Sequence, residues 1–338
     1  MKKFILFLIS IVLIPCILTF AFGLFSDDIK IGRNGNSLEN SKLGKDVLIE
    51  INGLYKSMDV EEFVLGVLPG TIPADYDEET LKVQAVLIRT NVLKEMQEKN
   101  TEDAADLSYR YLTVEERIAL WGERNYEKYE GRFEKAVAQT AGKVVEQEDS
   151  LIMALYHEVS IGKTASAEEI LGEDISYLQS VDSSQDVEAK HYMNIVSYTW
   201  QELAERNSGT AVEQEQTSGE SSEDTSTQNI EGNGTEQTTE GGNIAVAINE
   251  STENGFVKQL LVGSNVYTGD EAVERFGLSS TNFYVEEVEG GIRFVCLGKG
   301  NCLGVSLYGA NRMASEGKDM EQIIKYYYKG VSIDAYQL

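Results

Sequence analysis

The sequence predicts an α+β fold, in which helices and β-hairpins form one folded body. Three observations support this prediction. Apolar residues recur at helical spacing in some stretches, apolar and polar residues alternate in others, and glycine or asparagine turn signals separate the alternating stretches. The chain has 338 residues, 42% of them hydrophobic, and 3 prolines, which is enough apolar sequence for one large or two smaller domains.

The first half of the body is predicted to open with a hairpin and to continue with helices. Residues 47–58 alternate around the turn signal Asn52-Gly53, and Asp59 then stands where a helix N-cap is expected. The helical pattern is strongest in residues 78–99, where apolar residues recur every three or four positions. The predicted helices of this half span residues 59–68, 78–99 and 114–140.

β-Structure is predicted to dominate after Gly142. Residues 143–160 have the pattern of a strand, an acidic turn and a second strand, and residues 194–203 are helical or extended. The later elements are β-structure over 244–269, a short helix over 270–277, a hairpin over 283–298 around Gly290-Gly291, and a helix over 320–330 capped by Gly330.

One internal segment has a composition that cannot form a core. Residues 207–243 contain eight acidic and no basic side chains and are rich in Gly, Ser, Thr and Gln, so we expect disorder there. The expected organisation is an anchor at 1–25, a linker at 26–45, and one domain whose two parts, 46–206 and 244–338, flank this insertion.

The first residues predict a membrane anchor. Phe4 to Phe25 carries no charge and is long enough to span about 30 Å of hydrocarbon as a helix. Lys2 and Lys3 precede it and acidic residues follow it, so the N-terminus should be cytoplasmic and the bulk of the chain extracytoplasmic. A cleaved signal peptide, with Ala21-Phe22-Gly23 as its cleavage site, is the alternative.

Charge excludes one class of partner. The 56 acidic side chains against 29 basic ones give a formal net charge of -27, which repels phosphate backbones and disfavours nucleic-acid binding. The same charge would keep the surface away from anionic lipid, so attachment to a membrane depends on the apolar segment.

Generic chemical motifs leave the activity open. Cys296 and Cys302 are either a disulfide in an oxidising compartment or two unpaired buried thiols. His157 fits a hydrogen-bonded structural residue better than a catalyst. The glycine-rich stretch 298–304 fits a ligand loop and a tight turn equally well. With 56 acids, no catalytic carboxylate pair can be selected.

Three blocks of sequence, at residues 64–93, 134–183 and 253–332, resemble in this order the stage II sporulation protein D family (SpoIID/LytB domain). Residues 64–93 (VLGVLPGTIPADYDEETLKVQAVLIRTNVL) match its helix, Met-Pro loop and A-x-x-A-R-T-like helix. Residues 134–183 match its A-V-x-x-T-x-G, Y-H-S-T-S-G-G-x-T and Y-L-x-S-V stretches. Residues 253–332 match a block that ends in G-x-G-H-G-V-G-M-S-Q-Y-G-A, a helix and Y-Y-x-G. The resemblance covers residues 46–332 apart from the insertion.

The resemblance implies a role in peptidoglycan metabolism, in sporulation or in cell-wall remodelling. Sporulation members of the family cleave glycan strands as lytic transglycosylases, for which one glutamate suffices as acid and base. That glutamate lies two residues before the proline of the Met-Pro pair, where this chain has Thr71 before Pro73. A threonine hydroxyl is too weak an acid, and the loss should cost at least about 10²–10⁴-fold in rate.

Other positions of the motifs divide into departures and retained residues. The departures are Ile161 within the Ser-Gly-Gly run, Asn301 for the histidine, Cys302 for a glycine and Leu307 for the glutamine. The groove is expected to be formed by Thr71, Pro73, Arg89, Tyr156, His157, Ser160, Gly162, Lys163, Thr164, Gly300, Asn301, Ser306 and Tyr308. Some relatives are reported to hold zinc near the Y-H segment, but His157 alone cannot hold zinc, so neither a metal nor a cofactor is expected.

Three functions follow as hypotheses. The favoured one is a non-catalytic protein that binds peptidoglycan glycan strands, or a partner such as another cell-wall hydrolase or sporulation membrane protein. The second is an active lytic transglycosylase with a relocated acid, for which the candidates are Asp75, Asp77, Glu78 and Glu79. The third is a structural membrane protein that acts through its acidic insertion.

Overall fold

The computed structural model describes residues 38–208, 238–239 and 244–337. The predicted anchor at 1–25, most of the linker at 26–45 and nearly all of the insertion at 207–243 lie outside the described residues. Among the residues described, none of the helices combines the length and apolar character that a bilayer span requires. The described residues from Ser41 onward belong to one compact unit, which mixes helices and strands as predicted.

The hairpin and its helix cap are confirmed. Strand β1 (Asp46–Ile51) pairs antiparallel with β2 (Leu54–Asp59), and Asn52 and Gly53 form the turn with positive φ. The Asp59 side chain accepts a hydrogen bond from the Glu61 amide and so caps α2 (Val60–Val67). A 3₁₀ turn, η1 (Glu39–Ser41), precedes the hairpin, and another, η2 (Leu68–Gly70), continues α2.

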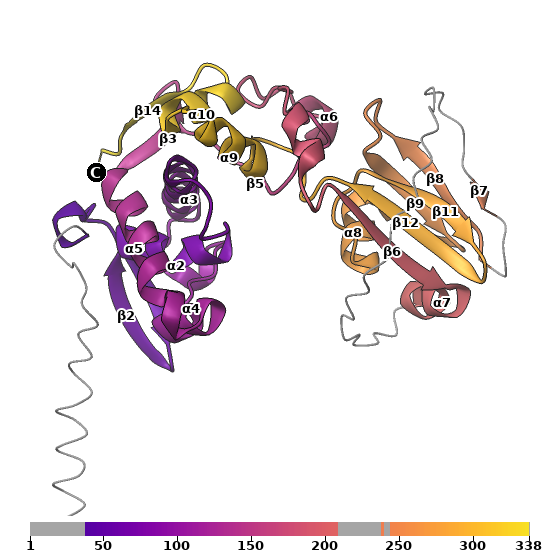
Figure 1. Ribbon diagram of the computed structural model, residues 1–338, viewed down its shortest axis with the longest axis horizontal. Helices are drawn as coiled ribbons and strands as arrows, with labels where there is room; N and C mark the ends of the chain where they lie inside the picture. The colour runs from indigo at the N-terminus through magenta and orange to yellow at the C-terminus, as the bar shows by residue number, and fades with distance from the viewer. Residues whose placement is uncertain (1–37, 209–237, 240–243, 338) are drawn as a thin grey trace, which may run out of the picture. The chain divides into compact units, whose positions relative to one another are not determined.

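Helix α3 (Glu78–Lys99) is the central helix of the first half (Figure 1). It contacts α2 and α5 (Glu123–Gln139) and, from the far end of the chain, α9 (Leu307–Ser315) and α10 (Met320–Tyr327). The predicted helical stretch 114–140 is two helices, α4 (Val114–Trp121) and α5, because Gly122 between them has a φ of 75°. The 3₁₀ turn η3 (Ala104–Asp106) lies between α3 and α4.

Buried ion pairs tie these helices together. Arg89 of α3 is 0% exposed and donates from Nε and Nη2 to the Glu61 carboxylate, over 2.8 and 2.6 Å. Arg117 of α4 is bound in the same bidentate way to Glu130 of α5, over 2.9 and 2.8 Å. In each pair, two parallel hydrogen bonds join the guanidinium to the carboxylate, so each buried charge has a hydrogen-bonded counter-ion.

The strands after Gly142 connect distant parts of the chain. Strand β3 (Lys143–Gln147) pairs with β4 (Ser150–Leu151) across the predicted acidic turn and with β14 (Ser332–Ala335) on its other side. Strand β5 (Tyr156–His157) pairs in parallel with β13 (Val305–Ser306). The second predicted strand of 143–160 is therefore two short ones, because its later residues pair with the C-terminal part. Helix α6 (Ala167–Leu171) and η4 (Ser184–Glu188) follow.

The second group of strands has its own core. Strand β6 (Met193–Thr199) pairs with β12 (Gly291–Leu297), which pairs with β11 (Phe283–Val288). A second sheet has the order β10 (Asn265–Thr268), β9 (Val257–Val262), β8 (Val246–Ser251), β7 (Thr238–Thr239). Helices α7 (Trp200–Ser208) and α8 (Gly269–Phe276) complete this part. The stretch 194–203 is thus both extended and helical, with the change at Thr199.

One sequence expectation in this part is corrected, and one pair of open alternatives is resolved. The last helix, α10, ends at Tyr327, so Gly330 is not its cap but lies in the following turn, with a φ of 67°. Cys296 and Cys302 are free and fully buried, which selects the thiol alternative. Cys296 packs in the core of the second group of strands, whereas Cys302 packs with Ala165 and Phe256 in a separate cluster.

Candidate functional site

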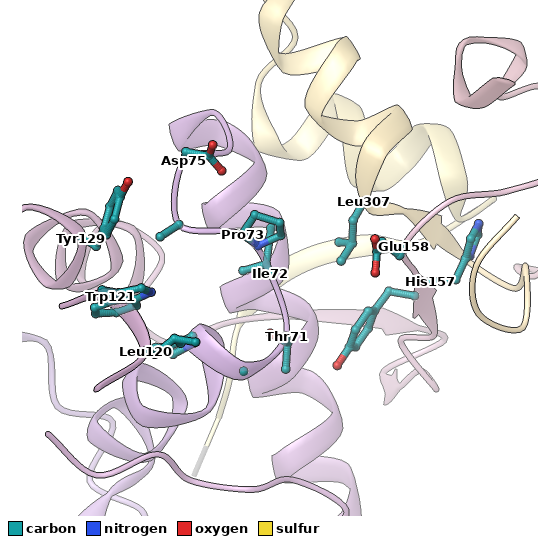
Figure 2. Close-up of a pocket in the computed structure, with 14 residues that line it drawn as sticks. Thr71, Ile72, Pro73, Asp75, Leu120, Trp121, Tyr129, His157, Glu158 and Leu307 are labelled. Carbon is teal, nitrogen blue, oxygen red and sulfur yellow. The ribbon is translucent and has the colours of Figure 1, made fainter. Parts of the chain in front are cut away.

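A cleft of about 670 Å³ lies where the first predicted block meets the Tyr156-His157 strand. Its walls come from the loop after α2, from the end of α4, from Tyr129 within α5, from β5 and from the start of α9 (Figure 2). The lining residues are Pro69, Gly70, Thr71, Ile72, Pro73, Ala74, Asp75, Leu120, Trp121, Tyr129, Tyr156, His157, Glu158 and Leu307. Of the predicted groove residues, Thr71, Pro73, Tyr156 and His157 line this cleft.

The loop that carries Thr71 is fixed from both ends. The Thr71 amide and hydroxyl both donate to the Leu68 carbonyl, each over 2.9 Å, so the hydroxyl proton already has an acceptor in the loop. Arg132 of α5 donates to the carbonyl of Ala74 over 2.7 Å, which holds the later part of the loop against the helix. Thr71 therefore presents neither a carboxyl group nor an unbonded hydroxyl proton at the position where the resemblance implies a glutamate.

One wall of the cleft is aromatic and apolar. Leu120 and Trp121 are the last two residues of α4, and Tyr129 comes from the next helix, α5. The Trp121 ring stacks on buried Phe133 at 5.5 Å and meets the Tyr129 ring edge-on at 5.8 Å. This wall could not be predicted from the sequence, because an aromatic residue at the end of an amphipathic helix has the same pattern as a core residue.

The other wall carries Glu158, a residue that the sequence analysis did not select. Its carboxylate is bound to Lys299 over 2.7 Å, and its amide and carbonyl bond to the Lys299 carbonyl and the Tyr308 amide, both over 3.1 Å. The backbone of Glu158 is thus held by the glycine-rich stretch and by α9. The signal that could have found it is its position in the Y-H-x segment, where the family has a serine.

The environment around the loop is acidic. Burial, with smaller contributions from the charges of Glu158 and Asp75, raises the pKa of the Tyr76 phenol to about 12. Burial likewise raises the pKa of Tyr156 to about 12, so both phenols remain protonated at neutral pH and can donate hydrogen bonds. The cleft therefore combines an aromatic wall with carboxylate acceptors and phenol donors.

His157 is a structural residue in this arrangement. Its Nδ1 lies 3.0 Å from the Leu303 carbonyl, which requires the proton on Nδ1, and its side chain is 3% exposed. Burial lowers its pKa to about 4, so the ring is neutral at neutral pH. Figure 2 shows the ring directed away from Thr71 and toward the glycine-rich stretch. Gly300 packs against it, because a Cβ at Gly300 would lie 2.8 Å from His157 Cβ.

Several predicted groove residues belong to a buried hydrogen-bond network instead. Asp186, 0% exposed, accepts from the Ser160 amide at 2.7 Å and from the Ser306 hydroxyl at 2.6 Å. Ser183 donates to the same carboxylate over 3.0 Å. These bonds join η4 to the start of α9 and to the segment after β5. The predicted groove residues Ser160 and Ser306 therefore stabilise the fold beside the cleft.

The remaining predicted groove residues also have structural partners. Arg89 is buried in the ion pair with Glu61. Thr164 bonds through backbone and side chain to Val181, Lys163 donates to Asn254, and the Asn301 side chain accepts from the Leu303 amide. Gly162 has a φ of 96°, and Tyr308 donates its amide to Glu158. These residues position the strand and the loops rather than line the cleft.

The four candidate substitute acids differ in their surroundings. Asp75 is exposed and lines the cleft. Asp77 caps α3 through the Glu79 amide, and Glu79 bonds to Lys82 and to the Met320 amide. The hydrogen bond from Lys135 is the main cause that lowers the pKa of Glu78, which disfavours it as an acid. Asp75 and Glu158 are the acidic residues among those that line the cleft.

The structure offers no metal cluster in its described part. No group of three His, Cys, Asp or Glu side chains within residues 38–208, 238–239 and 244–337 is arranged to hold a metal ion.

Cys302 has a left-handed backbone conformation, with a φ of 59°, at the position where the resembling motif has a glycine. That conformation explains the glycine of the motif physically.

Comparison with known proteins agrees with the motifs. A family model described as stage II sporulation protein (SpoIID) matches residues 52–146, which hold the loop of Thr71 and helices α3 to α5. The stage II sporulation protein D of Bacillus subtilis (strain 168) is 28% identical over 309 residues, covering 89% of this chain and 82% of that protein. The resemblance to the stage II sporulation protein D family is confirmed.

Two further relatives are similar to most of this chain. The stage II sporulation protein D of Bacillus amyloliquefaciens is 26% identical, over 88% of this chain and 80% of its own length. A Bacillus subtilis protein named amidase enhancer is 23% identical, over 80% of this chain and 40% of that protein. Similarity to the family therefore extends from the matched domain into the C-terminal part.

Proposed function

We propose that this protein is a membrane-anchored, extracytoplasmic member of the cell-wall machinery that binds peptidoglycan glycan strands in the cleft without cleaving them. The observation that carries the proposal is Thr71. It lines the cleft at the position of the family glutamate, and its hydroxyl donates to the Leu68 carbonyl. Relatives named for sporulation and for the enhancement of an amidase support a role at the cell wall.

The surroundings of Thr71 fit binding. The aromatic wall and the hydrogen-bonding groups of Asp75, Tyr156 and Glu158 give the cleft the mixture of apolar and polar surface that ligand sites have. Partner hydrolases or sporulation membrane proteins, brought to the glycan by this protein, would then perform the cleavage.

Co-sedimentation tests the binding. Residues 41–338, which form one compact unit, are incubated with purified insoluble peptidoglycan, and the protein in the pellet is measured over a range of protein concentrations. Saturable pelleting is expected. Pelleting that does not exceed that of an unrelated acidic protein of the same size would contradict the proposal.

The anchor can be tested separately. Residues 1–25 are proposed to hold the protein in the cell membrane, with the N-terminus in the cytoplasm. In intact protoplasts, external protease should degrade the chain after residue 45, and the chain should fractionate with membranes. A full-length protein that is protected from external protease, or that is secreted without residues 1–25, would contradict this topology.

One observation favours a second function, cleavage by a relocated acid. Glu158 and Asp75 both place carboxyl groups in the cleft that contains Thr71. The carboxylate of Glu158 is already engaged by Lys299, and Asp75 is exposed. These contacts support the binding function more than the catalytic one, because a general acid must keep a proton to deliver.

A further inference from the structure

The aromatic wall of the cleft is built more rigidly than a surface helix end requires. The Trp121 ring stacks on Phe133 with an interplanar angle of 10° and meets the edge of Tyr129 at 65°. The buried ion pair between Arg117 and Glu130 joins the same two helices, α4 and α5. Trp121 is thereby fixed before any ligand arrives, so little conformational entropy would be lost on binding.

The same wall exposes apolar surface to solvent inside the cleft. Leu120 is 55% exposed. Of the large hydrophobic side chains that are exposed in the described part of the chain, Leu120 is the one that lines the cleft. Trp121 beside it is half-buried. Figure 2 shows Leu120, Trp121 and Tyr129 on one side of the loop that contains Thr71 and Pro73, with Glu158 and Leu307 on the other.

We propose that Trp121, flanked by Leu120 and Tyr129, is a stacking platform for one sugar ring of the bound glycan. A pyranose ring has a face of C–H bonds and a rim of hydroxyl groups. The C–H face carries partial positive charge and is attracted to the negative face of an indole, by electrostatics as well as by dispersion. The hydroxyl rim needs hydrogen-bond acceptors and donors, which Asp75, Glu158 and Tyr156 provide in the same cleft.

This platform specifies the ligand of the proposed function and rests on it. It selects a neutral pyranose chain at this wall rather than a peptide stem, because a flat apolar ring face is what an indole and a leucine side chain complement. The aromatic contacts with Phe133 and Tyr126 would exist in a purely structural cluster too. The test must therefore measure ligand contact at Trp121 and not only stability.

The chain offers a spectroscopic test, because it contains two tryptophans, Trp121 and Trp200. Trp200 packs against the core of the second group of strands and is not among the residues that line the cleft. In W200F, Trp121 is the sole tryptophan. Titration of W200F (residues 41–338) with the N-acetylglucosamine tetramer should change its tryptophan emission saturably. W121F, which retains Trp200, should show no such change.

Binding to peptidoglycan supplies the second readout. W121A is expected to pellet with peptidoglycan at least about tenfold more weakly than wild type, as for a central aromatic contact. W200F is the matched control and should pellet as wild type does. L171A removes an apolar side chain of 45% exposure outside the cleft and should also be unchanged. Near-ultraviolet circular dichroism and the melting temperature establish that W121A is folded.

The outcomes separate this inference from the function on which it rests. If wild type does not pellet, the proposed function fails, and the platform with it. If wild type pellets, a folded W121A that pellets equally well would overturn the platform alone. The platform alone would also be overturned if W200F pellets saturably with peptidoglycan but its tryptophan emission does not change when it binds the tetramer.

Discussion

Thr71 and Glu158 line the same cleft, and of the two only Glu158 carries a carboxyl group. They approach the cleft from different elements, Thr71 from the loop after α2 and Glu158 from the residue after β5. The position at which the resemblance implies an acid therefore holds a neutral side chain here, while the carboxylate of Glu158 lines the same cleft in an ion pair with Lys299. This pair of residues determines which variants are informative.

Restoring the glutamate is the first informative variant. Thr71→Glu is expected to release anhydro-muropeptides from peptidoglycan at a rate at least about 10²-fold above the background measured with wild type, because it supplies a general acid at this position. Product is measured by mass spectrometry of the soluble fraction. Thr71→Gln has the same size without the acid and is the matched control. A folded T71E that binds but releases no product would show that Thr71 alone does not explain the loss of cleavage.

Removing the new carboxylate separates binding from catalysis. Glu158→Gln is expected to weaken pelleting by only a few-fold, because the amide keeps one acceptor and loses the ion pair, which is partly exposed. Product release should be undetectable before and after the change. Asp75→Asn is tested in parallel. Release by wild type that either variant abolishes would instead support the relocated-acid function.

The ion pair between Arg89 and Glu61 is predicted to stabilise the first half of the fold. Glu61→Gln leaves a buried guanidinium without its counter-ion and should lower the free energy of unfolding by about 3–5 kcal/mol. Denaturant unfolding at neutral pH measures this change. Glu98→Gln, which removes an exposed helical partner of Lys94, should cost no more than about 0.5 kcal/mol. Equal effects of the two variants would contradict the role assigned to the buried pair.

His157 predicts a dependence of stability on pH. Its pKa is about 4 in the folded protein, against about 6.5 for an unperturbed histidine, so the unfolded chain binds the proton first as pH falls. The contribution is complete above about pH 6.5 and is lost as pH falls toward 4, by about 3 kcal/mol in total. His157→Asn should flatten the stability curve between pH 7 and 5, measured by urea unfolding. A curve as steep as that of wild type would contradict the assignment.

The left-handed backbone of Cys302 predicts an unusual order of stability. With a φ of 59°, the residue strains any L side chain, so Cys302→Gly should be about 1 kcal/mol more stable than Cys302→Ala. Thermal unfolding compares the two. Cys296 is the control, because it lies within strand β12, where glycine weakens a strand and Cys296→Ala should be the more stable variant. The same order at both positions would exclude strain at Cys302.

Much of the fold could be predicted because local signals agree with it. The turn at Asn52-Gly53, the cap at Asp59 and the helix at 78–99 each have a physical signature in a short stretch of sequence. Long-range pairing could not be predicted in this way. The strand Tyr156–His157 is two residues long and is defined by Val305 and Ser306, far along the chain.

The cleft was predictable in part for the same reason. Motif resemblance led to Thr71, Pro73 and Tyr156, which the fold brings to one cleft. It gave no means to tell them from Ser160 and Ser306, whose partner is the buried carboxylate of Asp186. Trp121 and Glu158 were missed because their roles depend on which side chains meet across the cleft, and that is set by packing.

The most direct test of the central claim is the product analysis of wild-type protein. Residues 41–338 are incubated with purified peptidoglycan, and the soluble fraction is analysed by mass spectrometry for anhydro-muropeptides while the pellet is analysed for protein. The account predicts protein in the pellet and no anhydro-muropeptides above the level of a protein-free control. Anhydro-muropeptides released in proportion to the wild-type protein added would contradict it.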